Sequence, residues 1–214
     1  MNVVLKTISE EINPYLKHIL STKNGRYLSW EHCYNAFGDN SLDEDTLALH
    51  LGFYLASWGM YRGSTTLLQR DYKIHIPIVK ILKNFPELRC EINSEPNRDS
   101  IPKILELKSE IIKEYKEFKP TDTLITKIIL GTLGCVPAID RYFCDGMRSQ
   151  NLKNFSLTER FLNTLFDFVE EYEGQITDAQ LKLKIQKVYY PRMKIVDMYF
   201  WQLGFNMEKE TKKN

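Results

Sequence analysis

Residues 124–143 read LITKIILGTLGCVPAIDRYF, in which an apolar run, a glycine-containing turn and an acid–arginine pair follow one another. The apolar residues at 124–133 would cover most of the circumference of a helix, which is typical of a helix buried on all sides. Glycine and proline then predict a turn over residues 131–137. We expect a second helix from Ala138 onwards. This segment therefore predicts two helices joined by a tight turn inside a helical core.

The same helical period extends outwards from this segment. Apolar residues recur at three- and four-residue steps over 4–19, 47–58 and 101–119, and Pro14 predicts a kink or break in the first of these. No alternating stretch flanked by hairpin turns predicts a strand. The pattern predicts an all-α fold of roughly eight or nine helices.

Capping signals predict where several helices begin and end. A Ser or Thr followed three residues later by Glu or Gln forms a capping box, in which the two side chains satisfy free amides of the first turn. Such pairs occur at Ser41 and Glu44, Ser156 and Glu159, and Thr177 and Gln180. We expect these helices to end near Gly59, Gly174 and Tyr189, and Ser64 to cap a further short helix.

One internal stretch and the end of the chain bear on domain organisation. Residues 93–100 are the most polar and the richest in helix breakers, which makes them the best candidate for a boundary or mobile loop. Composition differs little on either side, so we expect one compact domain over residues 1–206. Pro191 and Gly204 should bracket its last helix, and residues 207–214 should form a polar, frayed tail.

Charge and composition exclude several classes of protein. The 29 Lys and Arg against 28 Asp and Glu leave a formal net charge of +1, so no global field draws the chain to nucleic acid or membranes. A hydrophobic fraction of 43% supplies a core, but no apolar stretch reaches the ~20 residues of a membrane-spanning helix. The four cysteines form no CxxC pair, and the N-terminus lacks a signal pattern. We therefore expect a soluble, cytoplasmic protein with reduced thiols and no membrane partner.

The common catalytic and cofactor motifs do not occur in the sequence. GxGxxG, GxxxxGK[ST], HExxH and GxSxG are all missing, which disfavours standard nucleotide and zinc chemistry. The four histidines are dispersed, and only His32 has a neighbouring cysteine, Cys33. Adjacent helical residues point about 100 degrees apart, so this pair alone does not hold a metal. We expect neither a metal site nor a bound cofactor.

Residues 57–64, SWGMYRGS, form the first candidate site. Two glycines flank Tyr61 and Arg62 at the expected end of a helix, and Trp58 directly precedes the first of them. Glycine lets a ligand approach the backbone closely, while an arginine beside aromatic rings can clamp a phosphate or carboxylate. The alternative is structural: a helix C-cap, a buried Trp58, and an Arg62 that binds the last carbonyl groups of the helix.

Lys127, Asp140 and Arg141 form the second candidate site. Lys127 lies in an apolar helix, where burial favours the neutral amine that nucleophilic chemistry requires. Asp140 is placed to pair with it across the turn, and these two are the candidate catalytic residues. Arg141 is a candidate ligand-binding residue. The alternative is a Lys127 that extends to solvent and a structural ion pair between Asp140 and Arg141.

A local excess of positive charge lies near the C-terminus. Between residues 179 and 196 the sequence has basic residues and no acidic one. The basic residues are Lys182, Lys184, Lys187, Arg192 and Lys194, with Tyr189 and Tyr190 among them. Basic groups beside aromatic rings are typical of a nucleic-acid surface. The alternative is the solvent-exposed face of one amphipathic helix.

Three segments resemble a family of uncharacterised bacterial proteins. They are RYLSWEHCYNAF at 26–37, SWGMYRGS at 57–64 and GTLGCVPAIDRYF at 131–143. This resemblance implies no activity.

Residues 130–138, LGTLGCVPA, are also similar to the LPGVGxxxA hairpin of the helix-hairpin-helix DNA glycosylases. That resemblance implies an all-helical protein whose hairpin amides contact a DNA phosphate and whose aspartate acts on a flipped nucleotide. The chain departs from the pattern, since Thr132 replaces the first hairpin glycine and Pro137 stands at the position of the lysine of bifunctional members. Ser156 stands where the acid is expected, so Asp140 would have to serve instead.

Two functions from different classes fit these residues. The first is a binding or interaction protein that recognises a phosphate-bearing or acidic partner through the loop around Arg62. The second is a nucleic-acid enzyme or DNA-binding protein related to the helix-hairpin-helix glycosylases, and a structural role in a larger assembly is a third. The observation that distinguishes these functions is whether four side chains point into one cavity: Trp58, Arg62, Lys127 and Asp140. An enzyme loses its site if they diverge.

Overall fold

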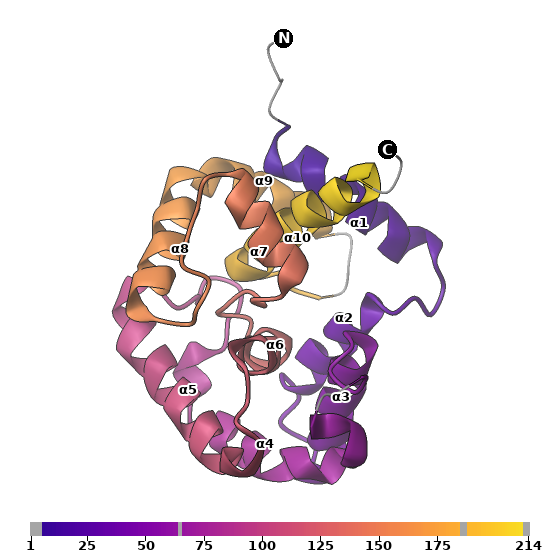
Figure 1. The fold of residues 1–214 in the computed structure, drawn as a ribbon, viewed down its shortest axis with the longest axis vertical. Helices are drawn as coiled ribbons and strands as arrows, with labels where there is room; N and C mark the ends of the chain where they lie inside the picture. The colour runs from indigo at the N-terminus through magenta and orange to yellow at the C-terminus, as the bar shows by residue number, and fades with distance from the viewer. Residues whose placement is uncertain (1–5, 64–65, 185–187, 212–214) are drawn as a thin grey trace.

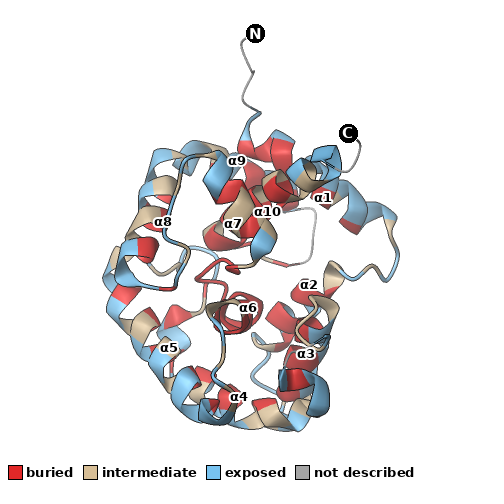
Figure 2. Ribbon diagram, viewed as in Figure 1, coloured by how far each residue is buried: buried red, intermediate tan, exposed pale blue. Residues whose placement is uncertain are grey.

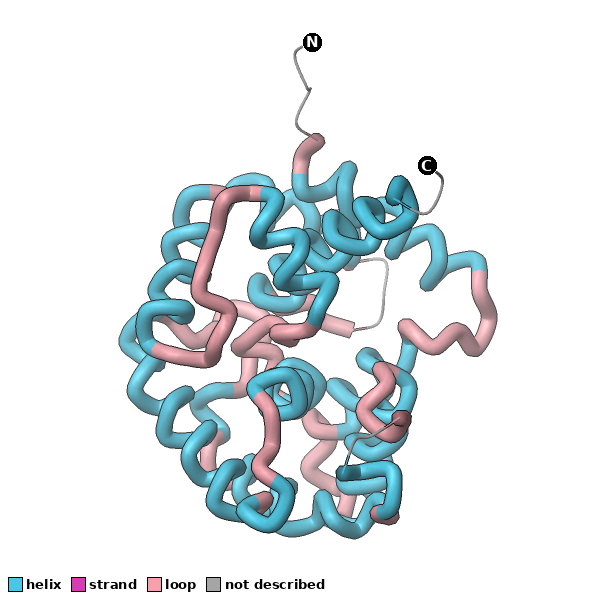
Figure 3. Tube along the Cα trace, in the orientation of Figure 1, coloured by secondary structure: helices cyan, strands magenta, loops and turns pink. Residues whose placement is uncertain are grey.

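The computed structural model describes residues 6–63, 66–184 and 188–211. Over these residues the chain forms ten α-helices and five short 3-10 helices, with one isolated bridge between Glu91 and Ser94 and no β-strand (Figure 1; Figure 3). The predicted all-α fold is confirmed, with ten helices in place of eight or nine.

The α-helices are α1 (Ile8–Ser21), α2 (Leu28–Ala36), α3 (Glu44–Ser57), α4 (Ile76–Lys83), α5 (Ile101–Glu114), α6 (Asp122–Thr132), α7 (Arg141–Ser149), α8 (Glu159–Glu171), α9 (Glu173–Leu183) and α10 (Arg192–Thr211). The 3-10 helices are η1 (Thr66–Gln69), η2 (Tyr72–His75), η3 (Pro86–Leu88), η4 (Arg98–Ser100) and η5 (Lys116–Phe118).

Helix α6 lies at the centre of the molecule with the other helices around it (Figure 1). Every residue from Leu124 to Thr132 is buried, including Lys127 (Figure 2). A helix that is apolar on all sides is stable only when other elements cover it completely. The buried helix predicted at 124–133 is therefore confirmed, although the next helix begins at Arg141 and not at Ala138.

Two glycines let α7 and α10 pack with their backbones in direct contact. A Cβ atom at Gly146 would lie 1.9 Å from the carbonyl oxygen of Phe200, and one at Gly204 would lie 2.0 Å from that of Tyr142. Any side chain at these positions would force the helices apart. Gly204 was expected to end the last helix, but it lies inside α10 because of this contact. The close approach brings the rings of Tyr142 and Trp201 within 5.4 Å of each other.

Two predicted helix starts are displaced along the chain. Helix α3 is capped by Asp43, and Ser41 hydrogen-bonds to Asp39 instead. Helix α8 is capped by Thr158 and not by Ser156. In both regions a better-placed Asp or Thr takes the cap, since either residue type can accept a hydrogen bond from the first turn.

The third predicted start, at Thr177, is wrong. Helix α9 begins at Glu173, so Thr177 and Gly174 both lie within it, and it ends at Leu183. Gly174 therefore does not separate two helices. Ser64, expected to cap a short helix, lies outside the described residues.

Helical structure also continues where the sequence predicted interruptions. Helix α1 runs through Pro14. Helix α10 extends to Thr211, so most of the expected polar tail is helical, and Glu208 within it pairs with Arg141. A proline costs a helix one hydrogen bond, and packing against neighbouring helices can offset this cost.

One hydrophobic core contains residues from α1 through α10 and therefore from both sides of residues 93–100. That stretch, the candidate boundary, is tied to the rest of the molecule through Glu95, whose carboxylate accepts hydrogen bonds from the amide of Arg192 (3.1 Å) and the hydroxyl of Tyr189. A shared core favours the single domain, which stays a prediction. No helix in the described part of the chain has the length and apolar character needed to cross a membrane.

Candidate functional site

Several segments that are distant in sequence meet around one cleft of about 340 Å³. They are the connection before α2, the end of α3 and the connection after it, α6, the start of α7, and α10. Trp58, Arg62, Lys127, Asp140 and Arg141 all line this cleft. The four residues whose convergence was in question therefore face one cavity.

Most of the charged side chains that line the cleft are basic. The charged members are Arg26, Arg62, Lys127 and Arg141, with Asp140 as the acidic side chain. Trp58, Tyr142 and Trp201 contribute aromatic surface to the same lining.

The end of α3 places Trp58 and Arg62 at the cleft. Helix α3 stops at Ser57 in a Schellman arrangement, in which the amides of Gly59 (3.0 Å) and Met60 (2.9 Å) donate to carbonyl groups of the last turn. Gly59 has a φ of 79°, in the left-handed region that favours glycine. The predicted helix end near Gly59 is confirmed.

Arg62 is exposed and has no hydrogen bond or ion pair with any residue that the structure describes. Its guanidinium lies against Gly59, where a Cβ atom would come within 2.8 Å of Nε. The carbonyl groups at the end of α3 are bonded to backbone amides, so Arg62 does not cap the helix. The structural alternative for Arg62 is therefore wrong, and its guanidinium borders the cleft without a partner.

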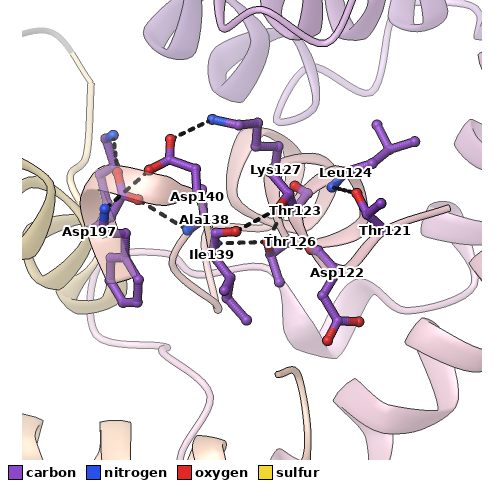
Figure 4. A network of polar contacts seen from close by, with 12 residues as sticks. Thr121, Asp122, Thr123, Leu124, Thr126, Lys127, Ala138, Ile139, Asp140 and Asp197 are labelled. Atoms are coloured by element: carbon purple, nitrogen blue, oxygen red, sulfur yellow. Dashed lines mark hydrogen bonds and ion pairs between the residues drawn. The ribbon is translucent and has the colours of Figure 1, made fainter. Parts of the chain in front are cut away.

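Lys127 and Asp140 form an ion pair inside the cleft (Figure 4). Lys127 Nζ lies 2.9 Å from Asp140 Oδ2, and the lysine side chain is only 4% exposed. The other carboxylate oxygen accepts the amide of Phe143 at 3.1 Å, which makes Asp140 the N-cap of α7. The pairing of Asp140 with Lys127 across the turn, expected from the sequence, is therefore present in the structure. Lys127 does not extend to solvent, and the partner of Asp140 is not Arg141.

The turn that carries Asp140 is fixed from two sides (Figure 4). On one side, two threonine hydroxyls of α6 hydrogen-bond to the backbone of Ile139, at 2.9 and 2.7 Å. On the other, Asp197 of α10 accepts the amide of Ala138 at 3.0 Å and pairs with Lys194 at 2.8 Å. The Lys194 side chain is 2% exposed, so this second ion pair lies in the core and supports the turn beneath the cleft.

Aromatic rings form one wall of the cleft. Trp58 stacks on Tyr27 with ring centroids 5.4 Å apart, and Trp201 meets both rings edge-on at 5.9 Å. The guanidinium of Arg26 lies 5.3 Å from the Trp58 ring centre and has no carboxylate partner among the described residues. Trp58 Nε1 is buried and finds no hydrogen-bond acceptor in the described part of the chain. A buried donor without an acceptor is uncommon in folded proteins.

Tyr61 does not line the cleft, in contrast to the prediction. Its hydroxyl lies 2.7 Å from His75 Nε2, and His75 Nδ1 lies 2.5 Å from the hydroxyl of the buried Tyr115. Burial lowers the pKa of His75 to about 4 and raises that of Tyr61 to about 12. Tyr61 therefore anchors the connection after α3 to His75, while the neighbouring Arg62 borders the cleft.

Arg141 lines the cleft but already has a partner. Its guanidinium lies 2.9 Å from Glu208 of α10, and the same carboxylate accepts the hydroxyl of Tyr142. Arg141 is 64% exposed. Its position agrees with the predicted role in ligand binding, but its charge is neutralised in this structure.

The basic residues between 179 and 196 do not form one surface. They do not share a helix, since α9 ends at Leu183 and α10 begins at Arg192. Arg192 pairs with Glu95 (3.4 Å) and Glu173 (3.9 Å), and Lys194 is buried in the core. Neither interpretation from the sequence holds for the buried Lys194, while Arg192 is partly exposed but paired. Lys187 lies outside the described residues.

The glycine turn at 131–137 is not available to a ligand. Every residue from 131 to 139 is buried, and a Cβ atom at Gly134 would lie 2.8 Å from Pro191. The turn amides are therefore covered by other segments, unlike the exposed hairpin that the glycosylase resemblance implies. Helices α6 and α7 contribute to the cleft through Lys127, Asp140 and Arg141 instead.

Three charged or aromatic residues of the cleft were not identified from the sequence: Arg26, Tyr142 and Trp201. Arg26 and Tyr142 lie beside Tyr27 and Arg141, so each belongs to an arginine–tyrosine pair that a search for arginine next to aromatic residues would find. Trp201 lies in an apolar helix and carries no such signal. Its contact with Trp58 exists only in the folded chain.

No family model, curated protein or solved structure matches this chain. The resemblances to uncharacterised bacterial proteins and to the helix-hairpin-helix glycosylases stay predictions. Among the described residues, no group of three or more His, Cys, Asp or Glu side chains is placed to hold a metal ion.

Proposed function

We propose that this protein is a cytoplasmic binding protein whose cleft recognises a phosphate-bearing or acidic ligand through Arg62. The observation that carries this proposal is that Arg62 borders the cleft with no acid, carbonyl group or other partner among the described residues. A planar guanidinium binds phosphate or carboxylate through two parallel hydrogen bonds.

The surroundings of Arg62 support an anionic ligand. Arg26 also lies in the cleft lining without a carboxylate partner, so two cations there have no counter-charge from the residues that the structure describes. Clefts lined by one sign of charge concentrate ligands of the opposite sign. The free thiols of Cys33, Cys90 and Cys135 are buried, which suits a reducing compartment.

The test is calorimetric titration of the full chain with inorganic phosphate and with succinate, at low and moderate salt. Arg62→Ala should lose roughly 2 kcal/mol or more of binding free energy, because a bidentate anion contact is removed. Arg62→Lys keeps the charge but not the planar fork, so it should restore little. Arg70→Ala is the matched control, since Arg70 is also an exposed arginine but lies outside the cleft. Equal affinity in the wild type and Arg62→Ala would refute the proposal.

A nucleic-acid enzyme is the second candidate function. The observation that favours it is that Lys127 and Asp140 line the same cleft as Arg62. Incubation of labelled single-stranded and duplex DNA with the wild type and with Asp140→Asn would reveal base release or strand cleavage. Identical, unreacted substrate in both samples excludes this candidate.

A further inference from the structure

The unpaired charge in the cleft indicates a dianion. Of its four basic side chains, Lys127 is neutralised by Asp140 and Arg141 by Glu208. Arg26 and Arg62 remain, each without a carboxylate partner among the described residues. Two free guanidinium groups match a phosphate monoester, which carries a charge of about −1.5 to −2 at neutral pH. A single carboxylate would satisfy only one of them.

The wall next to these guanidinium groups suits a flat ring. Trp58 and Tyr142 are partly exposed and line the cleft beside the buried Trp201. Aromatic side chains and guanidinium planes are the surfaces on which nucleobases stack. Arg26 lies over the Trp58 ring, and Tyr27 stacks on that ring. A base here would therefore stack on the guanidinium plane of Arg26 and on the partly exposed Tyr142.

The volume of the cleft limits the size of the ligand. About 340 Å³ is near the lower end of the ~300–1,000 Å³ typical of small-molecule sites. This space fits one nucleotide unit, and anything longer has to extend out of the cleft.

We infer that the cleft binds a nucleoside monophosphate unit, with its phosphate on Arg26 and Arg62 and its base against the aromatic wall. This inference rests on the proposed function and names its ligand class. The unit can come from two sources that share this chemistry, a free mononucleotide or the phosphorylated end of a nucleic-acid strand.

The experiment is a calorimetric titration of the full chain with each of a series of probes. The probes are inorganic phosphate, adenosine, adenosine 5′-monophosphate, and a short oligonucleotide with and without a 5′-phosphate. We expect the mononucleotide to bind at least about 10-fold more tightly than phosphate or adenosine alone, the ratio expected for base–aromatic stacking. Arg26→Gln and Arg62→Gln should each weaken mononucleotide binding by about 10-fold or more, while Arg70→Gln should bind like the wild type.

The outcomes distinguish a failure of the nucleotide inference from a failure of the proposed anion-binding function. If phosphate binds in an Arg62-dependent way and the mononucleotide binds no more tightly, the anion-binding function stands and the nucleotide inference is overturned. If no anion binds, both are overturned. Tighter binding of the phosphorylated oligonucleotide than of the mononucleotide supports the strand-end source, and equal binding supports the free nucleotide. Equal binding of the oligonucleotide with and without its phosphate overturns the inference. The comparison among probes uses the wild type alone, so this part of the result does not depend on the folding of a variant.

Discussion

Two basic regions of this molecule differ in whether carboxylates of the described chain pair with their positive charges. At the junction of α9 and α10, Arg192 pairs with Glu95 and Lys194 pairs with Asp197. In the cleft, Arg26 and Arg62 have no carboxylate partner in the described part of the chain. The two basic residues at the start of α10 are therefore paired, whereas two guanidinium groups of the cleft are not.

The difference follows from burial. A buried ammonium such as that of Lys194 has to be paired, since an isolated charge in a protein core is very costly. An exposed guanidinium such as that of Arg62 is solvated and tolerates the lack of a partner. Unpaired cations that gather at a cleft are therefore better evidence of a binding site than the density of basic residues along a sequence.

The largest expected effect is at the buried pair of the junction. Asp197→Ala leaves Lys194 charged and buried and removes the acceptor for the Ala138 amide, so it should lower the free energy of unfolding by about 3–5 kcal/mol. Urea unfolding followed by tryptophan fluorescence measures this loss. The double variant Lys194→Met, Asp197→Leu should recover much of it, because no uncompensated charge remains. A loss below about 1 kcal/mol for Asp197→Ala would show that the pair is not buried as described.

The next largest effect depends on pH and concerns His75, whose ring hydrogen-bonds to Tyr61 beside Arg62. The pKa of His75 is about 4 in the folded protein and 6.5 in a model imidazole, because burial disfavours the charged ring. Between these values the unfolded chain binds a proton that the folded chain does not, so the free energy of unfolding falls as the pH drops from about 6.5 towards 4. The full contribution is roughly 3 kcal/mol.

Urea unfolding at several pH values tests this prediction, with His75→Gln as the reference variant. Carboxylate titration contributes to both proteins, so the difference between them isolates His75. Parallel stability curves for the two proteins across this range would contradict the prediction.

A smaller effect is expected at the partly exposed pair of the junction. Arg192→Ala leaves Glu95 buried, with its side chain only 5% exposed, but this carboxylate keeps hydrogen bonds from Tyr189 and the amide of residue 192. We expect a loss of about 1–2 kcal/mol in the free energy of unfolding. Chemical denaturation gives the value, and a loss as large as that of Asp197→Ala would remove the distinction between the two pairs.

The smallest effects are expected in the cleft. Arg62→Ala should change the free energy of unfolding by no more than about 0.5 kcal/mol, because its guanidinium has no hydrogen bond or ion pair with the described residues to lose. Arg26→Ala should cost no more than about 1 kcal/mol, since it removes only the cation–π contact with Trp58. Thermal unfolding of both variants beside the wild type measures this. Destabilisation of Arg62→Ala by 1 kcal/mol or more would mean that Arg62 has a structural role after all.

The sequence by itself determined the helical class, the buried central helix and the end of α3. Each of these depends on local chemistry: the apolar period of residues 124–133, and a glycine at position 59 that can adopt a left-handed backbone. It also identified five residues that line the cleft: Trp58, Arg62, Lys127, Asp140 and Arg141. An arginine near glycines and aromatic residues, or a lysine inside an apolar run with an acid after the next turn, is conspicuous in a sequence.

Only the tertiary structure decided which charges are paired and which glycines end helices. Gly204 looks like a helix terminator, but it lies inside α10 because α7 passes within 2.0 Å of its Cβ position. Lys194 looks exposed among other basic residues, but it lies in the core. Glu95 reaches Arg192 across 97 residues of sequence, and Trp201 joins Trp58 from the opposite end of the chain. Pairing and close packing depend on which segments meet in space, and local sequence patterns carry no information about those distances.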